Sequence, residues 1–293
     1  MVLVVVTLIV RNSSSSSPVK ASSTAARTHS NQSGPTSSSG GSTSRGSTRP
    51  GTASVPILVY HVINTQPPTS TANPALYVPV DEFSSQMQAL KASGWHAVTL
   101  NKLAANWTRG TTLGAGKPIV ITFDGGYASH YANALPVLKR LGWVGVENLP
   151  VTGLPPSEGG LSDAQIRALI AAGWELDTEG LTDTNLTTVD PTRLAAQIAT
   201  ARQTLRSRYA VPVNWFAYPA GGFNAPATAE VRTAGYLGAS TMDPGWATPQ
   251  QDRFRLPRLV VAGGTTSTQL LAQIASAKTA APVPEASSGP GLR

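Results

Sequence analysis

The feature that most constrains the fold of this chain is a junction that occurs four times. In each copy an amphipathic stretch ends in glycine, an aromatic residue follows at once, and a strand-like run begins: LKASGWHAV, LKRLGWVGV, LIAAGWELD and VRTAGYLGA. Glycine readily adopts the left-handed conformation that closes a helix, so each junction predicts a helix followed directly by a strand. The spacing between copies is irregular, which indicates a shared junction and not a sequence repeat.

The rest of the chain from residue 55 alternates in the same way. Apolar runs predict strands at 55–63, 95–100, 118–123, 145–151, 174–178, 213–219, 236–241 and 254–261, with helical patterns between them. Repeated βα units with short loops predict a parallel sheet. About seven such units favour an α/β fold of the distorted (β/α) barrel type, whose site lies at the C-terminal ends of the strands.

Composition divides the chain into four parts. Residues 1–11 form a short apolar segment that is similar to a signal or anchor, and residues 12–54 are a Ser-, Thr- and Gly-rich basic stretch. Such a stretch has little to bury, so it predicts a disordered linker. A globular domain is expected over residues 55–281 and a disordered tail over residues 282–293.

The charge of the chain is concentrated before the globular domain. The formal net charge is +7, and the cations before residue 55 supply +5 of it: Arg11, Lys20, Arg27, Arg45 and Arg49. The nearly neutral domain argues against nucleic-acid binding. We expect an exported or N-terminally tethered protein, extracellular or envelope-associated, whose basic linker contacts the cell envelope. A solvated linker with incidental arginines is the alternative.

Polar residues follow the ends of several predicted strands. These residues are His61 after VPILVY, Asp124 after PIVITF, Glu179 and Asp183 after WELDT, and Tyr218 with Pro219 in the run that begins VNWFA. Because the C-terminal ends of parallel strands meet at one edge, the residues are predicted to converge in an enzyme-like pocket. The chain has no cysteine, so thiolate metal sites are excluded.

Five segments carry a family resemblance in the expected order. They read VPILVYHVI, ITFDGGYASHYANALPVLKRLG, GWELDTEGLTDTNLTTVD, FAYPAGGFNAPATAEVRTAGYLGAS and FRLPRLVV, within about residues 55–262. The chain resembles the polysaccharide deacetylases, also called NodB-homology or carbohydrate esterase family 4 domains. The early YH element is similar to the permuted branch of that family. The resemblance implies hydrolysis of a carbon–nitrogen bond, in which a metal assists removal of an N-acetyl group from a glycan.

The resemblance also implies roles for individual residues. Asp124 matches the general base and His61 the general acid. The backbone amide of Ala220 matches an oxyanion donor, and Tyr218 and Pro219 of the same turn match substrate-binding positions.

The three positions that hold the metal in the family are substituted here. The second aspartate of the T-F-D-D-G motif is Gly125, and the two histidines of S-H-x-x-x-H fall on Glu179 and Asp183. These residues form no histidine-rich zinc site, and two carboxylates hold Mg²⁺, Mn²⁺ or Ca²⁺ weakly at most. The cofactor therefore stays undetermined.

Two functions from different classes follow. The first is a deacetylase-like hydrolase that acts on an N-acetylated envelope or extracellular glycan, with the usual metal site altered or lost. The second is a catalytically inactive carbohydrate-binding or scaffolding pseudoenzyme of the cell envelope. The loss of all three ligand positions, with the scaffold motifs still readable, motivates the second.

Several residues near the motifs have simpler interpretations. Asp124 could accept backbone amides within its glycine turn, and His61 could bind a carbonyl group at a strand end. His130 is predicted to be exposed at the start of a helix. Arg255 and Arg258 are candidates for an ion pair with Asp124 or with another acid.

Overall fold

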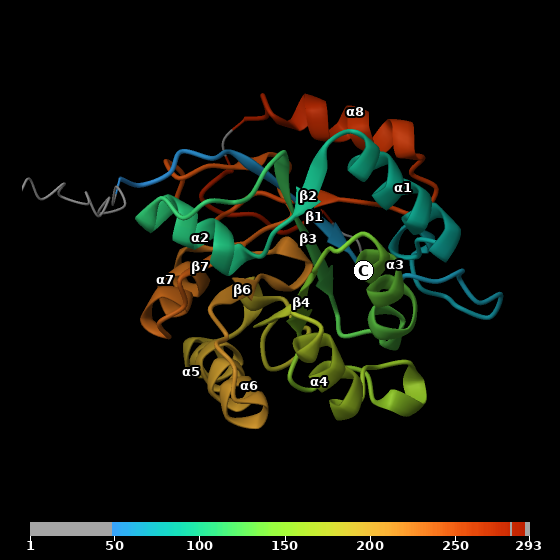
Figure 1. Cartoon of the computed structure of the whole chain (residues 1–293). Helices are drawn as coiled ribbons and strands as arrows, with labels where there is room; N and C mark the ends of the chain where they lie inside the picture. The colour runs from blue at the N-terminus through green and yellow to red at the C-terminus, as the bar shows by residue number, and fades with distance from the viewer. Residues whose placement is uncertain (1–48, 282, 291–293) are drawn as a thin grey trace, which may run out of the picture. The chain divides into compact units, whose positions relative to one another are not determined.

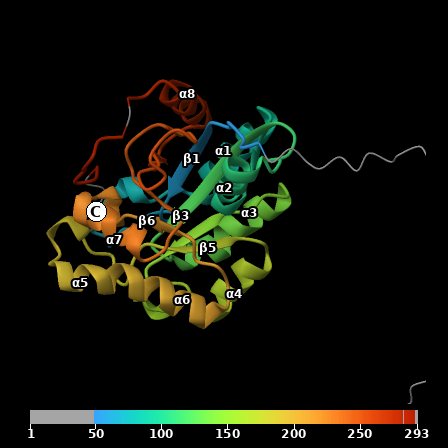
Figure 2. The same ribbon diagram turned by 90° about the vertical axis from the view of Figure 1, so that its left-hand side faces the viewer.

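The computed structural model describes residues 49–281 and 283–290. The predicted segment 1–11 and residues 12–48 of the predicted linker lie outside these described residues. Within residues 49–290 a curled sheet is covered on its outer side by helices (Figures 1 and 2). The sheet order is β7-β6-β5-β4-β3-β1-β8, with β2 beside β3 and β9 beside β1. The predicted distorted (β/α) barrel is thereby confirmed.

The strands are short and almost all parallel. Every ladder among the described strands is parallel except that between β1 and β8. Their bounds are β1 (Val55–Tyr60), β2 (Trp95–Ala97), β3 (Lys117–Asp124), β4 (Val146–Leu149), β5 (Glu175–Thr178), β6 (Trp215–Ala217), β7 (Gly238–Ser240), β8 (Trp246–Ala247) and β9 (Leu259–Val260).

Helices connect most of the strands. The α-helices are α1 (Val80–Ala92), α2 (Leu100–Arg109), α3 (Leu135–Arg140), α4 (Asp163–Ala171), α5 (Pro191–Ala195), α6 (Ala201–Tyr209), α7 (Ala225–Thr233) and α8 (Ser267–Ala277). Short 3-10 or π turns are η1 (Pro74–Leu76), η2 (His130–Ala134), η3 (Pro156–Glu158), η4 (Leu186–Thr188), η5 (Ala196–Thr200) and η6 (Pro219–Gly221). None of the helices in the described part of the chain is long and apolar enough to cross a bilayer.

The four helix–strand junctions behave as the sequence predicts. The glycine of each has a positive φ, between 69° and 88°: Gly94, Gly142, Gly173 and Gly235. Each one ends a helix, and a strand of the sheet begins within a few residues of it. The junction therefore sets the short αβ loops that allow successive strands to pair in parallel.

An aromatic cluster fixes β1 and β3 against α1. Tyr60 and Phe123 stack at 5.9 Å between ring centroids, and Phe83 of α1 meets Tyr60 edge-on at 5.1 Å. All three side chains are fully buried. The Tyr60 hydroxyl donates to Gln86 Oε1 at 2.8 Å, which satisfies its polar end inside the core. This packing fixes the C-terminal ends of β1 and β3 relative to one another.

Two buried acids, Glu175 and Asp177, lie on β5. The Asn101 amide donates to both Glu175 oxygens (2.9 and 3.2 Å), and the Asn214 and Trp215 amides donate to Asp177 Oδ1 (2.8 Å each). Burial raises the pKa of Asp177 well above its usual value, and Glu175 raises it further. Burial also raises the pKa of Glu175. Burial and the second carboxyl group therefore both favour the protonated form of Asp177.

The Asp177→Asn variant is expected to be more stable than the wild type at pH 8, by about 1 kcal/mol, because its amide donates a permanent hydrogen bond to Glu175. The pKa of Asp177 is raised above the unfolded value of 3.8, so its stabilising contribution is lost as pH rises through the folded pKa. Urea midpoints measured from pH 4 to pH 8 should fall less steeply for the variant. A variant less stable than the wild type at pH 8 contradicts the raised pKa of Asp177 as the origin of this pH dependence.

Both ends of the described chain contact the domain. Gly51 donates its amide to Asn106 of α2 at 2.8 Å, although the predicted linker extends to residue 54. At the other end, Ser287 and Phe223 exchange backbone hydrogen bonds of 2.8 and 3.0 Å. Residues 283–290 of the segment predicted to be disordered are thus seated beside the turn that contains Ala220.

Candidate functional site

Four polar residues meet at the C-terminal edge of the sheet, two of which, His61 and Asp124, the sequence places at strand ends. Asp124 is the last residue of β3, His61 follows β1 directly, and Asn148 on β4 is in register with Asp124. Arg258 precedes β9, and its long side chain reaches across β3. Neighbouring parallel strands therefore bring His61 and Asp124 together, as the sequence predicts.

Asp124 is fully buried and held by three hydrogen bonds. The Arg258 guanidinium donates from Nη1 to Oδ1 (2.8 Å) and from Nη2 to Oδ2 (2.7 Å), and Asn148 donates to Oδ1 (2.7 Å). Burial by itself raises the pKa of Asp124, but the Arg258 cation outweighs burial and holds the pKa below its usual value. Asp124 is therefore a carboxylate of low proton affinity at neutral pH.

His61 lies near this ion pair and is neutral. Burial lowers the pKa of His61 to about 4, and the cationic Arg258 and His130 add to the lowering, while Asp124 acts in the opposite sense. A neutral imidazole can donate one hydrogen bond, but it lacks the extra proton that a general acid transfers.

The two arginines of FRLPR have different partners. Arg258 is fully buried and also donates to Thr241 O (2.8 Å), whereas Arg255 pairs with Asp252 at 3.1 Å near the surface. Arg258 is thus the residue that braces Asp124.

His130 is buried, so the prediction that it is exposed is wrong. It lies in η2, and its Nδ1 is 3.0 Å from a Glu147 oxygen while its Nε2 donates to the His61 carbonyl oxygen. Burial lowers the pKa of His130, but the Glu147 carboxylate outweighs this effect and raises it. The sequence holds a signal for this pair, since the acid in the apolar strand GVENL requires a buried partner. The pair supports the segment that carries His61.

The three positions that the resemblance assigns to the metal do not make a ligand set. Glu179 is buried, and burial raises its pKa well above the usual value, with Asp124 and Asp183 adding to the effect. Asp183 is exposed. Among residues 49–281 and 283–290, no group of three His, Cys, Asp or Glu side chains is arranged to hold a metal ion.

Gly125 has no side chain that could bind a metal, and a neighbouring ring also fills the space in which such a side chain would start. Its φ is +96°, and a Cβ built on it would lie 2.6 Å from Cε2 of Tyr127. The tyrosine ring therefore fills the direction in which an acid at this position would start. The donor set of this chain does not fit the histidine- and aspartate-bound metal that the resemblance implies.

The turn of the predicted oxyanion donor is strained. Ala220 has φ +50° in η6, one of two non-glycine residues with positive φ in the described part of the chain. Strain of this kind costs about 1–3 kcal/mol and often occurs at functional sites. Tyr218 is fully buried with its hydroxyl bound to Phe254 O (3.0 Å), and Pro219 is buried, so the Tyr218 side chain packs in the core.

A cavity of about 370 Å³ lies beside the site. Its lining includes Tyr77, Tyr127 and Asn133, together with Asn64 and Ser129. Tyr127 also lies close to Glu179, Asp183 and Asp124, whose charges, after burial, raise the pKa of its hydroxyl to about 12. Aromatic rings with a few polar groups form a surface suited to a sugar ring.

Solved structures define the class of this fold. The chain is similar to the deacetylase PplD of Streptococcus pyogenes in complex with acetate, with a TM-score of 0.69 and 24% identity over 76% of this chain and 98% of that one. It is also similar to BC0361, a polysaccharide deacetylase from Bacillus cereus, with a TM-score of 0.67 and 23% identity over 76% of this chain and 69% of that one. These likenesses establish the barrel fold.

The sequence comparisons name the family. Residues 113–239 match the family described as polysaccharide deacetylase. YxkH of Bacillus subtilis (strain 168), which bears the provisional name of a polysaccharide deacetylase, is 26% identical over 226 residues, 77% of this chain and 78% of that protein. Residues 113–239 are therefore similar to the polysaccharide deacetylases, and the resemblance read from the motifs of this chain is confirmed.

Proposed function

We propose that this chain recognises an N-acetylated glycan of the cell envelope or extracellular space at the C-terminal edge of its barrel, and that metal-dependent deacetylation is lost. The observation that carries the proposal is the Gly125 position, where the Tyr127 ring occupies the direction of a ligand side chain. The family implies deacetylation of glycans. In this chain the N-acetylated glycan is bound but is not deacetylated by a metal-dependent reaction. An exported or tethered location is part of the proposal, in line with the basic segment before residue 55.

The free energy that a catalytic metal contributes to deprotonation of water is large, and its absence supports the loss of turnover. A catalytic metal lowers the pKa of its bound water from 15.7 to roughly 7. At about 1.36 kcal/mol per pKa unit, this is on the order of 12 kcal/mol of easier deprotonation, an upper bound because the bound hydroxide is a weaker nucleophile. Asp124 cannot replace it, because both of its oxygens accept hydrogen bonds and Arg258 keeps its pKa low.

A second candidate is slow removal of the acetyl group without a metal. The observation in its favour is that Asp124 and His61 interact in one site. In this candidate Asp124 acts as the general base, His61 as the general acid and the Ala220 amide as the oxyanion donor. The neutral state of His61 and the low proton affinity of Asp124 both argue for a slow reaction.

Acetate release and glycan binding separate the two candidates. Chitotetraose and N-acetylated peptidoglycan fragments are incubated with the protein and Zn²⁺, Co²⁺, Mn²⁺ or a chelator, and binding is followed in parallel by calorimetry. We expect binding that the chelator does not change, without acetate release above the blank. Metal-dependent release that Asp124→Asn abolishes would overturn the proposal, and metal-independent release abolished by the same substitution would establish the second candidate. A protein that neither binds nor turns over these glycans contradicts both.

A further inference from the structure

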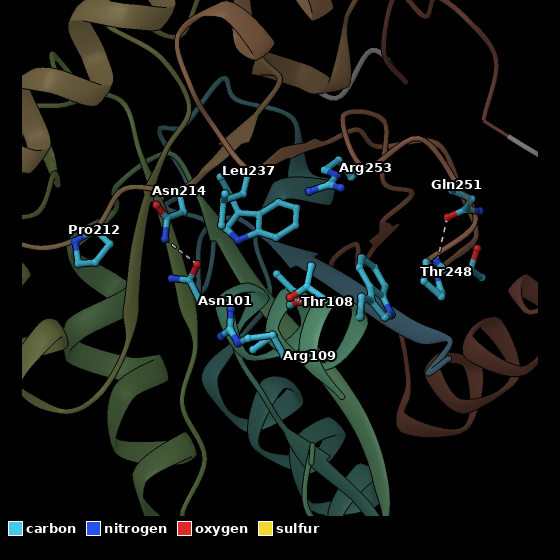
Figure 3. Close-up of a pocket in the computed structure, with 14 residues that line it drawn as sticks. Asn101, Thr108, Arg109, Pro212, Asn214, Leu237, Thr248, Gln251 and Arg253 are labelled. Atoms are coloured by element: carbon cyan, nitrogen blue, oxygen red, sulfur yellow. Dashed lines mark hydrogen bonds between the residues drawn. The ribbon is translucent and has the colours of Figure 1, made fainter. Parts of the chain in front are cut away.

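A second cavity lies at the opposite end of the sheet from Asp124. It measures about 650 Å³ and is bounded by α2, by the residues that precede β6 and β7, and by the segment after β8 (Figure 3). Asn214 precedes β6 and Leu237 precedes β7, so the cavity belongs to the N-terminal ends of these strands. The residues of the deacetylase site do not line it.

The charge of this cavity is positive. Arg109 of α2 and Arg253 line it, and none of its lining residues is acidic. Among the described residues neither guanidinium has a hydrogen-bond or ion-pair partner, whereas Arg208, Arg232 and Arg255 are each paired with an aspartate. Two cations without protein partners on one cavity favour an anionic ligand.

The lining is also apolar and aromatic. It includes Trp107, Trp215, Pro212 and Pro249, and Leu237, which is 40% exposed. The Trp107 indole donates to Ala53 O (2.8 Å), which fixes the ring in the wall. Trp215 is buried, so the exposed Leu237 and the partly buried Trp107 ring provide the surface for the apolar face of a ring-shaped ligand.

Neutral polar groups complete the lining. The Asn214 side chain donates from Nδ2 to Asn101 Oδ1 at 2.8 Å, and the Thr248 backbone N–H donates to Gln251 Oε1 at 3.0 Å (Figure 3). Thr108 adds a hydroxyl group. Amide and hydroxyl groups of this kind bind the hydroxyls of a sugar without adding charge.

We propose that this cavity is a second glycan-binding site, specific for a sugar ring that carries a carboxylate or a phosphate. The two arginines supply the positive charge that attracts the anionic group, and the Trp107 and Leu237 side chains pack on the ring. A cavity of this volume holds a ligand of one to a few sugar units. The site does not depend on the deacetylase site, so the protein can hold an anionic polymer at one end of its barrel and an N-acetylated glycan at the other.

The test is binding of four probes to the full chain, followed by calorimetry and by the indole N–H signals of tryptophan. Tetragalacturonate and glucose 6-phosphate carry the charged ring in its two forms, chitotetraose is the neutral ring, and inorganic phosphate is the anion alone. We expect at least one charged sugar to bind about tenfold or more tightly than inorganic phosphate, with affinity falling as salt rises. The charged sugar that binds identifies the anionic group.

Variants locate the binding on this cavity. Arg109→Gln and Arg253→Gln are each expected to weaken binding of the charged sugar about tenfold or more, while Arg206→Gln, an exposed arginine of α6, leaves it unchanged. Equal binding of phosphate and charged sugar, equal loss in all three variants, or no binding of either charged sugar overturns the proposal. Chitotetraose carries no charge, so its binding should be the same in Arg109→Gln and Arg253→Gln as in the wild type, and a failure at the deacetylase site is seen separately as a loss of chitotetraose binding.

Discussion

Replacement of Arg258 by methionine is expected to lower the free energy of unfolding by about 3–5 kcal/mol, because it leaves the Asp124 charge buried without its partner. Both residues are fully buried, and the guanidinium makes two hydrogen bonds to the carboxylate. Asn148 alone remains to bind Asp124 in the variant. Urea denaturation at pH 7 gives the loss directly.

Two controls separate the buried ion pair from the general effect of losing an arginine. Arg255→Met removes a partly exposed pair with Asp252 and is expected to cost at most about 1 kcal/mol. The double variant Asp124→Asn with Arg258→Met removes both charges, so it should be more stable than Arg258→Met alone. A double variant that is less stable would show that packing of Arg258, and not charge, dominates.

The same pair predicts how the loss depends on pH. The pKa of Asp124 is lowered, so its contribution is present above the unfolded value of 3.8 and is lost as pH falls through the folded pKa. In Arg258→Met the buried carboxyl can take up a proton as the pH falls. Because burial without Arg258 raises the pKa of Asp124, the difference in stability between variant and wild type should narrow as the pH falls from 7 toward 4.

The barrel was predictable because its signals are local. Glycine and an aromatic residue at each helix–strand junction require only a few neighbouring residues, and Gly94, Gly142, Gly173 and Gly235 all have the expected positive φ. The strand β8 and the helices α2 and α8 were not predicted. The two-residue strand β8 pairs antiparallel with β1, a contact that depends on residues almost 200 positions away. Helix α8 does begin with a capping box of Thr266 and Gln269, which the sequence contains.

The sequence predicts the site residues that follow the ends of strands, but it does not predict which buried side chains contact them. Asp124 and His61 follow strands, so the parallel topology alone brings them together. The choice between Arg255 and Arg258 depends on which side chain points inward in a segment without regular structure, which local patterning does not encode. His130 was misplaced because a polar residue at a helix start is usually exposed, and only Glu147, 17 residues away, makes burial favourable.

The pair of His130 and Glu147 should be the second large contributor to stability. In the Glu147→Leu variant the histidine loses its carboxylate, and we expect a loss of about 3–5 kcal/mol in the free energy of unfolding. The Glu147→Gln variant keeps an oxygen that can accept from His130 Nδ1, so its loss should be smaller, about 1–3 kcal/mol. The pKa of His130 is raised by Glu147, so the stabilisation is present below 6.5, the unfolded value, and is lost as pH rises through the folded pKa.

The pair also holds the site together, which a second measurement tests. His130 donates to the His61 carbonyl, and the Gly126 amide, next to the Asp124 turn, hydrogen-bonds to Glu147. Loss of Glu147 should therefore release the segment that carries His61, so that this segment moves toward solvent. The pKa of His61 should then rise from about 4 toward 6.5. The His61 ring signals in an NMR titration, at a temperature where Glu147→Leu and Glu147→Gln are both folded, report this change. If the pKa of His61 does not change in a destabilised Glu147→Leu variant, the pair of His130 and Glu147 contributes to stability only. The geometry of the site is then set by Asp124 and Arg258.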